Sequence, residues 1–138
     1  MSNDIFLDTS GIYAYLLKQD QKHKHAASFI QETINSGGHL ITTDYIIDEI
    51  TTLLKARGHG HIIARIFDGI LSSGACRIEW MEQEHFHRTK TMFLKYIDHH
   101  WSFTDCFSFV IMQHLGIKKA LTKDTHFLEA GFIFLLKE

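Results

Sequence analysis

The sequence contains no proline and only two cysteines, Cys76 and Cys106. Without proline, the ends of helices and loops depend on glycine and on polar capping residues. Two cysteines are too few for a disulfide framework, and their positions lack the spacing of metal ligands. We therefore expect reduced thiols in a cytoplasmic protein.

Long apolar runs and a strong charge of one sign are also missing. The longest apolar run, residues 132–136, is long enough only for a strand, whereas a membrane helix needs about 20 apolar residues. The first four residues lack the basic and then apolar layout of a signal peptide. With 14 basic and 16 acidic side chains, a broad basic surface for nucleic acid is excluded, although a local basic patch is not. We expect no membrane association.

The 138 residues have the length of one domain, and 45% of them are apolar, which is typical of a folded protein. No repeat or linker interrupts them, so we predict a single domain over residues 1–138. Short apolar runs alternate with segments of helical period. Strands are predicted at residues 5–7, 40–41, 76–80, 120–122 and 132–136, with helices at residues 12–17, 25–34, 44–55, 61–71, 82–97 and 105–115. This alternation predicts an α/β fold with a central parallel sheet of about five strands and helices on both faces.

Acidic residues stand where ligand sites of such sheets occur, beyond the carboxyl ends of the strands. Asp8 directly follows the first strand, and Asp124 comes two residues after the fourth. Each alone is equally well explained as a turn or capping residue. Asp105 opens the most apolar helix, and Ser102 three residues before it matches a capping box. Capping and metal binding are compatible at a helix N-terminus.

Glu49 falls on the apolar face predicted for residues 44–55. That face is formed by Tyr45, Ile46, Ile50, Leu53 and Leu54. A buried carboxylate needs a cation, a metal ion or a proton, so we expect Glu49 to be buried beside one. The alternative is a residue at the edge of the face that reaches solvent or pairs with an arginine.

Several carboxylates at one sheet edge repel one another unless a divalent cation neutralises them. Oxygen ligands alone indicate Mg²⁺ or Mn²⁺. Such ions promote phosphodiester hydrolysis by activating a water and stabilising the leaving oxygen. The acids therefore indicate a metal-dependent hydrolase of phosphodiesters.

Four segments, in this order and at these intervals, resemble the motifs of the PIN-domain nucleases, most closely the single-domain VapC-type toxins. The segments are IFLDTS from residue 5, TTDYIIDEI from residue 42, SFTD from residue 102 and LTKDTHF from residue 121. They place the family's acids at Asp8, Glu49, Asp105 and Asp124, of which the fourth position varies most in the family.

The resemblance implies a PIN fold and a metal-dependent endoribonuclease that hydrolyses RNA. It implies Mg²⁺ or Mn²⁺ ligands and catalytic acids at Asp8, Glu49, Asp105 and Asp124. Thr104 is the first candidate to assist them by hydrogen bonding, and Thr9 and Ser10 are further candidates. It also implies a homodimer and, for toxin members, a cognate antitoxin protein.

Two other functions stay open from the sequence. A housekeeping PIN nuclease would act on RNA without an antitoxin, and expression would then cause no growth arrest. A catalytically inactive PIN domain would bind RNA or protein, which the presence of all four acids disfavours. A phosphoaspartate receiver and a haloacid-type phosphatase also begin with a strand and an aspartate. The sequence disfavours both, because the acidic pair of a receiver is missing and the Asp-x-Asp of the phosphatase is interrupted by Ser10.

Other polar and aromatic residues have competing interpretations. Lys55, Arg57 and Lys123 either contact RNA phosphates or are ordinary surface charges. Trp101 either stacks on a base or packs in the core, and we favour packing. The paired histidines suggest zinc but do not share helix faces, so a solvated surface explains them better; they are His23 and His25, His85 and His87, and His99 and His100.

Overall fold

A computed structural model describes residues 3–137, and residues 1–2 and 138 of the predicted domain lie outside that range. Five strands form one sheet in the order β3-β2-β1-β4-β5, and every neighbouring pair is parallel. This confirms the predicted sheet. The strands are β1 Ile5–Leu7, β2 Leu40–Thr43, β3 Cys76–Glu79, β4 Lys119–Leu121 and β5 Ile133–Phe134.

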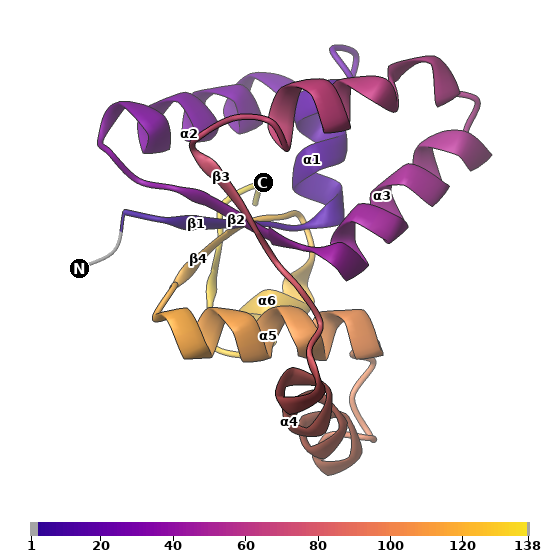
Figure 1. Ribbon diagram of the computed structural model, residues 1–138, viewed down its shortest axis with the longest axis vertical. Coiled ribbons are helices and arrows are strands. Elements are labelled where there is room, and N and C mark those ends of the chain that lie inside the picture. The colour runs from indigo at the N-terminus through magenta and orange to yellow at the C-terminus, as the bar shows by residue number, and fades with distance from the viewer. Residues whose placement is uncertain (1–2, 138) are drawn as a thin grey trace.

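Helices cover both faces of the sheet, as predicted. In Figure 1, α1, α2 and α3 lie above the sheet, α5 and α6 lie below it, and α4 lies outside α5. The α-helices are α1 Thr9–Leu16, α2 His23–Asn35, α3 Asp44–Ala56, α4 Gln83–Lys95, α5 Phe103–Leu115 and α6 Thr125–Glu129. No helix within residues 3–137 has the length and apolar character needed to cross a membrane.

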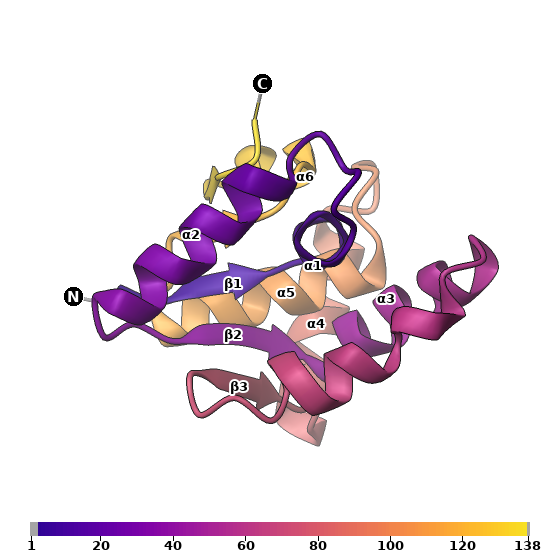
Figure 2. The ribbon, with the colours of Figure 1, turned by 90° about the horizontal axis from the view of Figure 1, so that it is seen from above.

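The strand order reverses direction between β1 and β4. The chain runs outward from β1 through β2 to β3, and it then returns to the other side of β1 to form β4 and β5. Leu7 in β1 pairs with Leu121 in β4, so the residues that follow these strands are neighbours. The view in Figure 2, from above the sheet, shows β1 and β2 running side by side toward α1 and α3. Crevices at such reversals are the usual ligand sites of open parallel sheets.

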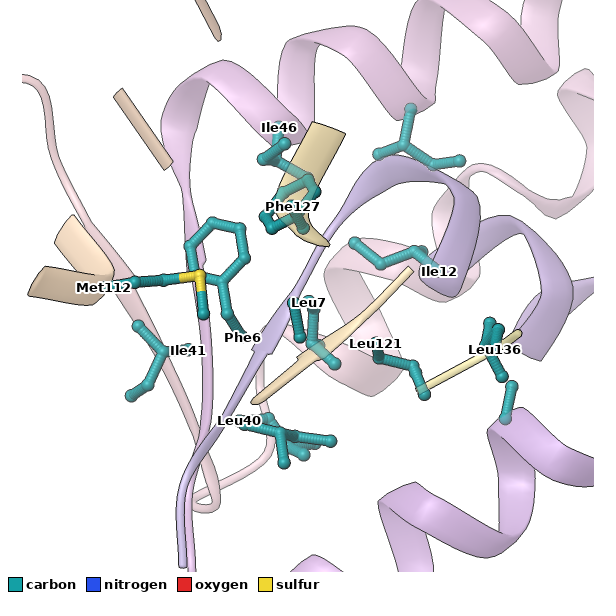
Figure 3. Close-up of a cluster of buried hydrophobic side chains, with 14 of the residues drawn as sticks. Phe6, Leu7, Ile12, Leu40, Ile41, Ile46, Met112, Leu121, Phe127 and Leu136 are labelled. Carbon is teal, nitrogen blue, oxygen red and sulfur yellow. The ribbon is translucent and has the colours of Figure 1, made fainter. Parts of the chain in front are cut away.

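The core forms where the sheet meets α5. Every residue of α5 from Cys106 to Met112 is buried, because α5 lies against the sheet on one side (Figure 1) and packs against α4 on the other. This explains why its sequence is apolar nearly all round. Figure 3 shows buried side chains of the sheet and its helices, including Phe6, Met112 and Phe127. The core therefore anchors the strand ends from which the acids project.

The segment predicted as one helix at residues 61–71 is irregular, so that prediction is wrong. It contains a 3₁₀ helix, η1 Gly60–Ile62, and a π-helix, η2 Ile66–Ile70, closed by a hydrogen bond of 2.8 Å from Leu71 N to Ile66 O. Glycines within and before the segment weaken an α-helix, although the apolar spacing resembles one. The structure also contains a helix, α6, that the sequence did not predict. The last strand, β5, is shorter than the predicted residues 132–136.

Gly11 lets α1 approach β4 closely. A Cβ atom at this position would lie 1.9 Å from the carbonyl oxygen of Leu121, which is backbone and cannot move aside cheaply. The first turn of α1, which follows Asp8 directly, therefore depends on glycine at this position.

Gly11→Ala is expected to lower the free energy of unfolding by roughly 2 to 3 kcal/mol. The overpacking outweighs the intrinsic gain of about 1 kcal/mol for alanine in a helix. Gly74→Ala is the matched control, because nothing lies within 4 Å of its Cβ position and its φ is not positive. Urea unfolding measures both variants. Equal midpoints for the two would contradict the close approach of α1 to β4.

Candidate active site

A hollow of about 510 Å³ lies at the carboxyl ends of β1 and β4. All four predicted acids line it. Asp8 follows β1, Glu49 lies in α3, Asp105 lies in the first turn of α5, and Asp124 precedes α6. The structure thus brings together side chains that are up to 116 positions apart, from Asp8 to Asp124.

Asp8 is the buried acid of the group, with 6% of its surface exposed. It stands at the N-terminus of α1, but its side chain makes no capping bond and is available to the hollow. The Thr122 hydroxyl donates a hydrogen bond of 2.6 Å to Asp8 Oδ2. Burial raises the pKa of Asp8 to about 7; hydrogen bonds from Thr122 and the Thr9 backbone oppose the rise, and Asp105 and Glu49 add to it.

Asp105 is fixed by a capping box and by a histidine. The Ser102 hydroxyl accepts from Asp105 N at 2.9 Å, and Ser102 N donates to Asp105 Oδ2 at 3.0 Å. His126 Nδ1 lies 3.0 Å from the same oxygen. Burial raises the pKa of Asp105, and the charge of Asp124 adds to this, although the bonds to Ser102 and His126 counteract it. The predicted cap is real, and it leaves Asp105 in the hollow.

Asp124 also has two roles. Its side chain accepts a hydrogen bond of 2.9 Å from His126 N, so it caps α6 as the turn interpretation predicts. The same oxygen lies 3.3 Å from His126 Nδ1. Burial lowers the pKa of His126. The hydrogen bond to Asp105 and the charges of Asp124, Asp105 and Glu129 together raise this pKa by more, so the net shift is upward. The imidazole therefore offsets repulsion between two carboxylates.

The prediction that Glu49 is buried is wrong. The buried face of α3 consists of Ile46, Ile50 and Leu54, and Glu49 lies at its edge as an exposed residue. This edge of α3 borders the open hollow instead of the core, so Glu49 keeps its hydration. The Thr9 hydroxyl donates a short hydrogen bond to Glu49 Oε1, which turns the carboxylate toward the strand ends.

Thr104 lies beside the acids but lines a second hollow. That hollow, of about 660 Å³, shares Thr9, Glu49 and Leu53 with the first. The Thr104 side chain is half-buried, and its backbone carbonyl accepts a hydrogen bond from Ser108 within α5. The structure therefore places Thr104 and Glu49 in the lining of one hollow.

Sequence reasoning missed His126 and the hydroxyl of Thr122. His126 falls within the fourth motif, two positions after Asp124, and that spacing was the available signal. Thr122 Oγ1 donates to Asp8, accepts from Asp124 N at 2.9 Å and lies 3.1 Å from Ser10 Oγ. One hydroxyl thus ties two of the acids together.

Trp101 packs in the core, which confirms the favoured interpretation. Its side chain is 8% exposed, and its ring lies 5.1 Å from that of Phe109. The indole nitrogen donates to Glu129 Oε1 at 3.0 Å. Trp101 therefore anchors the loop before α5 in the core, and its buried ring is not accessible for stacking on an RNA base.

The donor set fits a divalent cation. Ligand atoms of Asp105, Asp124 and His126 all lie within 4.8 Å of one another, and this is the one such group found among residues 3–137. Asp8 adds a buried carboxylate that forms no ion pair within residues 3–137, and Glu49 adds an exposed carboxylate. Oxygen donors of this kind suit Mg²⁺ or Mn²⁺, and one imidazole is compatible with Mn²⁺.

Comparison with known proteins agrees with this geometry. The family model of the PIN domain matches residues 5–133. This chain belongs to the PIN domain family. The PIN chain is 28% identical over 129 residues to "23S rRNA-specific endonuclease VapC20" from two strains of Mycobacterium tuberculosis, covering 94% of this chain and 95% of the relative.

A solved structure extends the comparison to the fold. The crystal structure of Mycobacterium tuberculosis VapC20, described as a sarcin-ricin loop cleaving toxin, matches this PIN domain with a TM-score of 0.79 at 24% identity. The match covers 94% of this chain and 96% of the other. The PIN-like fold is thereby confirmed, and the chain is a homologue of VapC-type nucleases, which supports its assignment as an enzyme.

In the absence of bound metal, ionisation of Asp8 is expected to make the protein less stable as the pH rises from about 4 to about 7. Its pKa is 3.8 as a free side chain and about 7 in the fold, so across this window the folded state holds a proton that the unfolded state has lost. The difference between these two pKa values corresponds to a loss of at most about 4 kcal/mol in the free energy of unfolding.

Asp8→Asn removes this dependence and should stabilise the protein above pH 7 in the presence of EDTA. Urea unfolding at a series of pH values measures the effect. Asp98→Asn is the control, because the Asp98 side chain is 83% exposed and lies outside the hollow. Parallel pH profiles for wild type and Asp8→Asn would show that burial of Asp8 carries no such cost.

Proposed function

We propose that this PIN domain is a metal-dependent endoribonuclease and that residues 1–138 act as a single domain. The observation that carries the proposal is the convergence of the four motif acids in one hollow, with Asp8 buried at the reversal of the strand order. An acidic hollow of this kind is costly without a cation, because like charges and lost hydration both oppose ionisation.

The proposed ligands of Mg²⁺ or Mn²⁺ are Asp8, Glu49, Asp105 and Asp124. A bound divalent ion supplies the positive charge that activates the attacking water and stabilises the leaving oxygen. The chain's own contribution is orientation. Thr122 holds Asp8, Thr9 holds Glu49, and the Ser102 backbone holds Asp105. Thr104, beside Glu49, is proposed to assist by hydrogen bonding in the site.

RNA is the proposed substrate, because the relative with 28% identity is named as an endonuclease of 23S rRNA. We further propose that the chain is a toxin with a cognate antitoxin protein, that it acts in the cytoplasm, and that it forms a homodimer. Large exposed apolar side chains near α4 support a protein partner: Phe86 is 43% exposed, Leu94 60% and Ile97 63%. A housekeeping nuclease would share the site and lack the antitoxin.

Asp8→Asn and Asp105→Asn are each expected to lower RNA cleavage by at least about 100-fold. Each removes a charge from the metal site while keeping the size of the side chain. Cleavage of total RNA with Mn²⁺ is followed on gels, with Asp98→Asn as the exposed acidic control. Unchanged circular dichroism establishes that the variants fold. Cleavage that persists in both variants would refute the assignment of these acids.

Saturating Mn²⁺ is expected to stabilise the wild type by about 2.7 kcal/mol at 100 times its dissociation constant. Asp105→Asn should lose most of that gain and should be no less stable than wild type in EDTA, because repulsion with Asp124 is relieved. Thermal unfolding with and without Mn²⁺ measures both effects and needs no RNA. An equal shift for both proteins would place the metal elsewhere.

A further inference from the structure

Arg57, the residue that directly follows α3, extends the line of the acidic site that Glu49 begins on that helix. Glu49, Leu53 and Arg57 are spaced four residues apart, and all three line the hollow. Residues with this spacing lie on the same face of a helix, and a rise of 1.5 Å per residue puts Arg57 about 12 Å from Glu49 along the axis. A few nucleotides of RNA span that distance. The guanidinium therefore belongs to the surroundings of the acid cluster, outside the proposed set of metal ligands.

An aromatic ring holds this guanidinium in place. Arg57 Cζ lies 5.2 Å from the centroid of the Tyr13 ring, a cation–π contact. Tyr13 is half-buried in α1 and packs against the core, and the His59 ring lies 6.3 Å away in an edge-on contact. A planar guanidinium stacked on a fixed ring loses less freedom when its donors bind an anion.

The charge of Arg57 is available to a ligand. Among residues 3–137, no carboxylate forms an ion pair with Arg57. Lys123, which is the other arginine or lysine lining the hollow, differs because its Nζ lies 3.1 Å from Asp20 Oδ2. Lys55 lies two residues before Arg57 on α3 and is exposed, but it does not line the hollow.

We propose that Arg57, held over the ring of Tyr13, binds a backbone phosphate of the RNA substrate close to the acidic site. This inference rests on the proposed ribonuclease function. The acids of the hollow repel an RNA strand wherever the metal leaves them charged, so a cation that no acid neutralises favours binding. Guanidinium donors match two phosphate oxygens at once. Arg57 is thus a positioning residue, which places the strand and leaves the chemical step to the acids.

The test compares Arg57→Ala, Arg57→Lys and Lys55→Ala in cleavage of a fluorescently labelled single-stranded RNA with Mn²⁺ over a series of KCl concentrations. Arg57→Ala is expected to raise KM by about three- to tenfold with little change in kcat. The slope of log(kcat/KM) against log[KCl] should weaken by about 0.7, the loss of one phosphate contact to a single strand. Arg57→Lys should keep the slope and recover part of KM.

Lys55→Ala is the matched control and should change neither KM nor the slope. Calorimetry should give the same Mn²⁺ affinity for Arg57→Ala as for wild type, which separates strand binding from damage to the metal site. If Arg57→Ala behaves as Lys55→Ala does, or if kcat falls while KM and the slope stay unchanged, the phosphate contact is overturned and the nuclease function stands.

If the wild type cleaves no RNA, the proposed function fails, and fluorescence anisotropy with the same RNA and salt series decides the inference separately. If the wild type binds the RNA and the dependence of the binding constant on KCl concentration is weaker in Arg57→Ala, the result supports the phosphate contact in a protein that binds RNA without cleaving it. Absence of binding overturns both.

Discussion

The carboxylate of Asp8 loses its water where β1 lies between β2 and β4 in the sheet. Its neighbours return only part of the lost hydration, through the Thr122 hydroxyl and the Thr9 backbone. The pKa of Asp8 therefore rises to about 7, which means that the buried carboxylate is more stable with a bound proton or cation than as an unpaired anion. The other acids are arranged around this buried carboxylate, so the site gains most from a divalent ion at this end of the sheet.

The hydroxyl of Thr122 couples the buried acid to the rest of the site. A hydroxyl has one proton, and since Thr122 donates it to Asp8, the amide of Asp124 and the hydroxyl of Ser10 must both donate to Thr122. Ser10 in turn accepts from the backbone nitrogen of Lys123. These hydrogen bonds therefore link the end of β1, the first turn of α1, the end of β4 and the start of α6, and through them the positions of Asp8 and Asp124 are coupled.

Sequence patterns predicted the parts of this arrangement that follow from periodicity and chain order. Alternation of strands and helices put Asp8 and Asp124 at one edge of a parallel sheet, and the structure agrees. The exposure of Glu49 could not be obtained this way, because helical spacing identifies a face but not whether core or open hollow lies beyond it. For His126 the sequence offered only the two-residue spacing from Asp124. Its contact with Asp105 depends on how α5 and α6 pack together, which that spacing does not encode.

Charge balance explains why recognition of RNA has to be local in this protein. A net charge of −2 gives no general attraction for a polyanion, and the acids of the hollow add repulsion at the point of cleavage. Lys123 is partly neutralised by Asp20, and His126 is engaged by Asp105 and Asp124. Arg57 rests on the ring of Tyr13 and forms no ion pair within residues 3–137, so its charge is available to a phosphate. Its distance from the acids lets it bind the RNA strand without competing for the metal ligands.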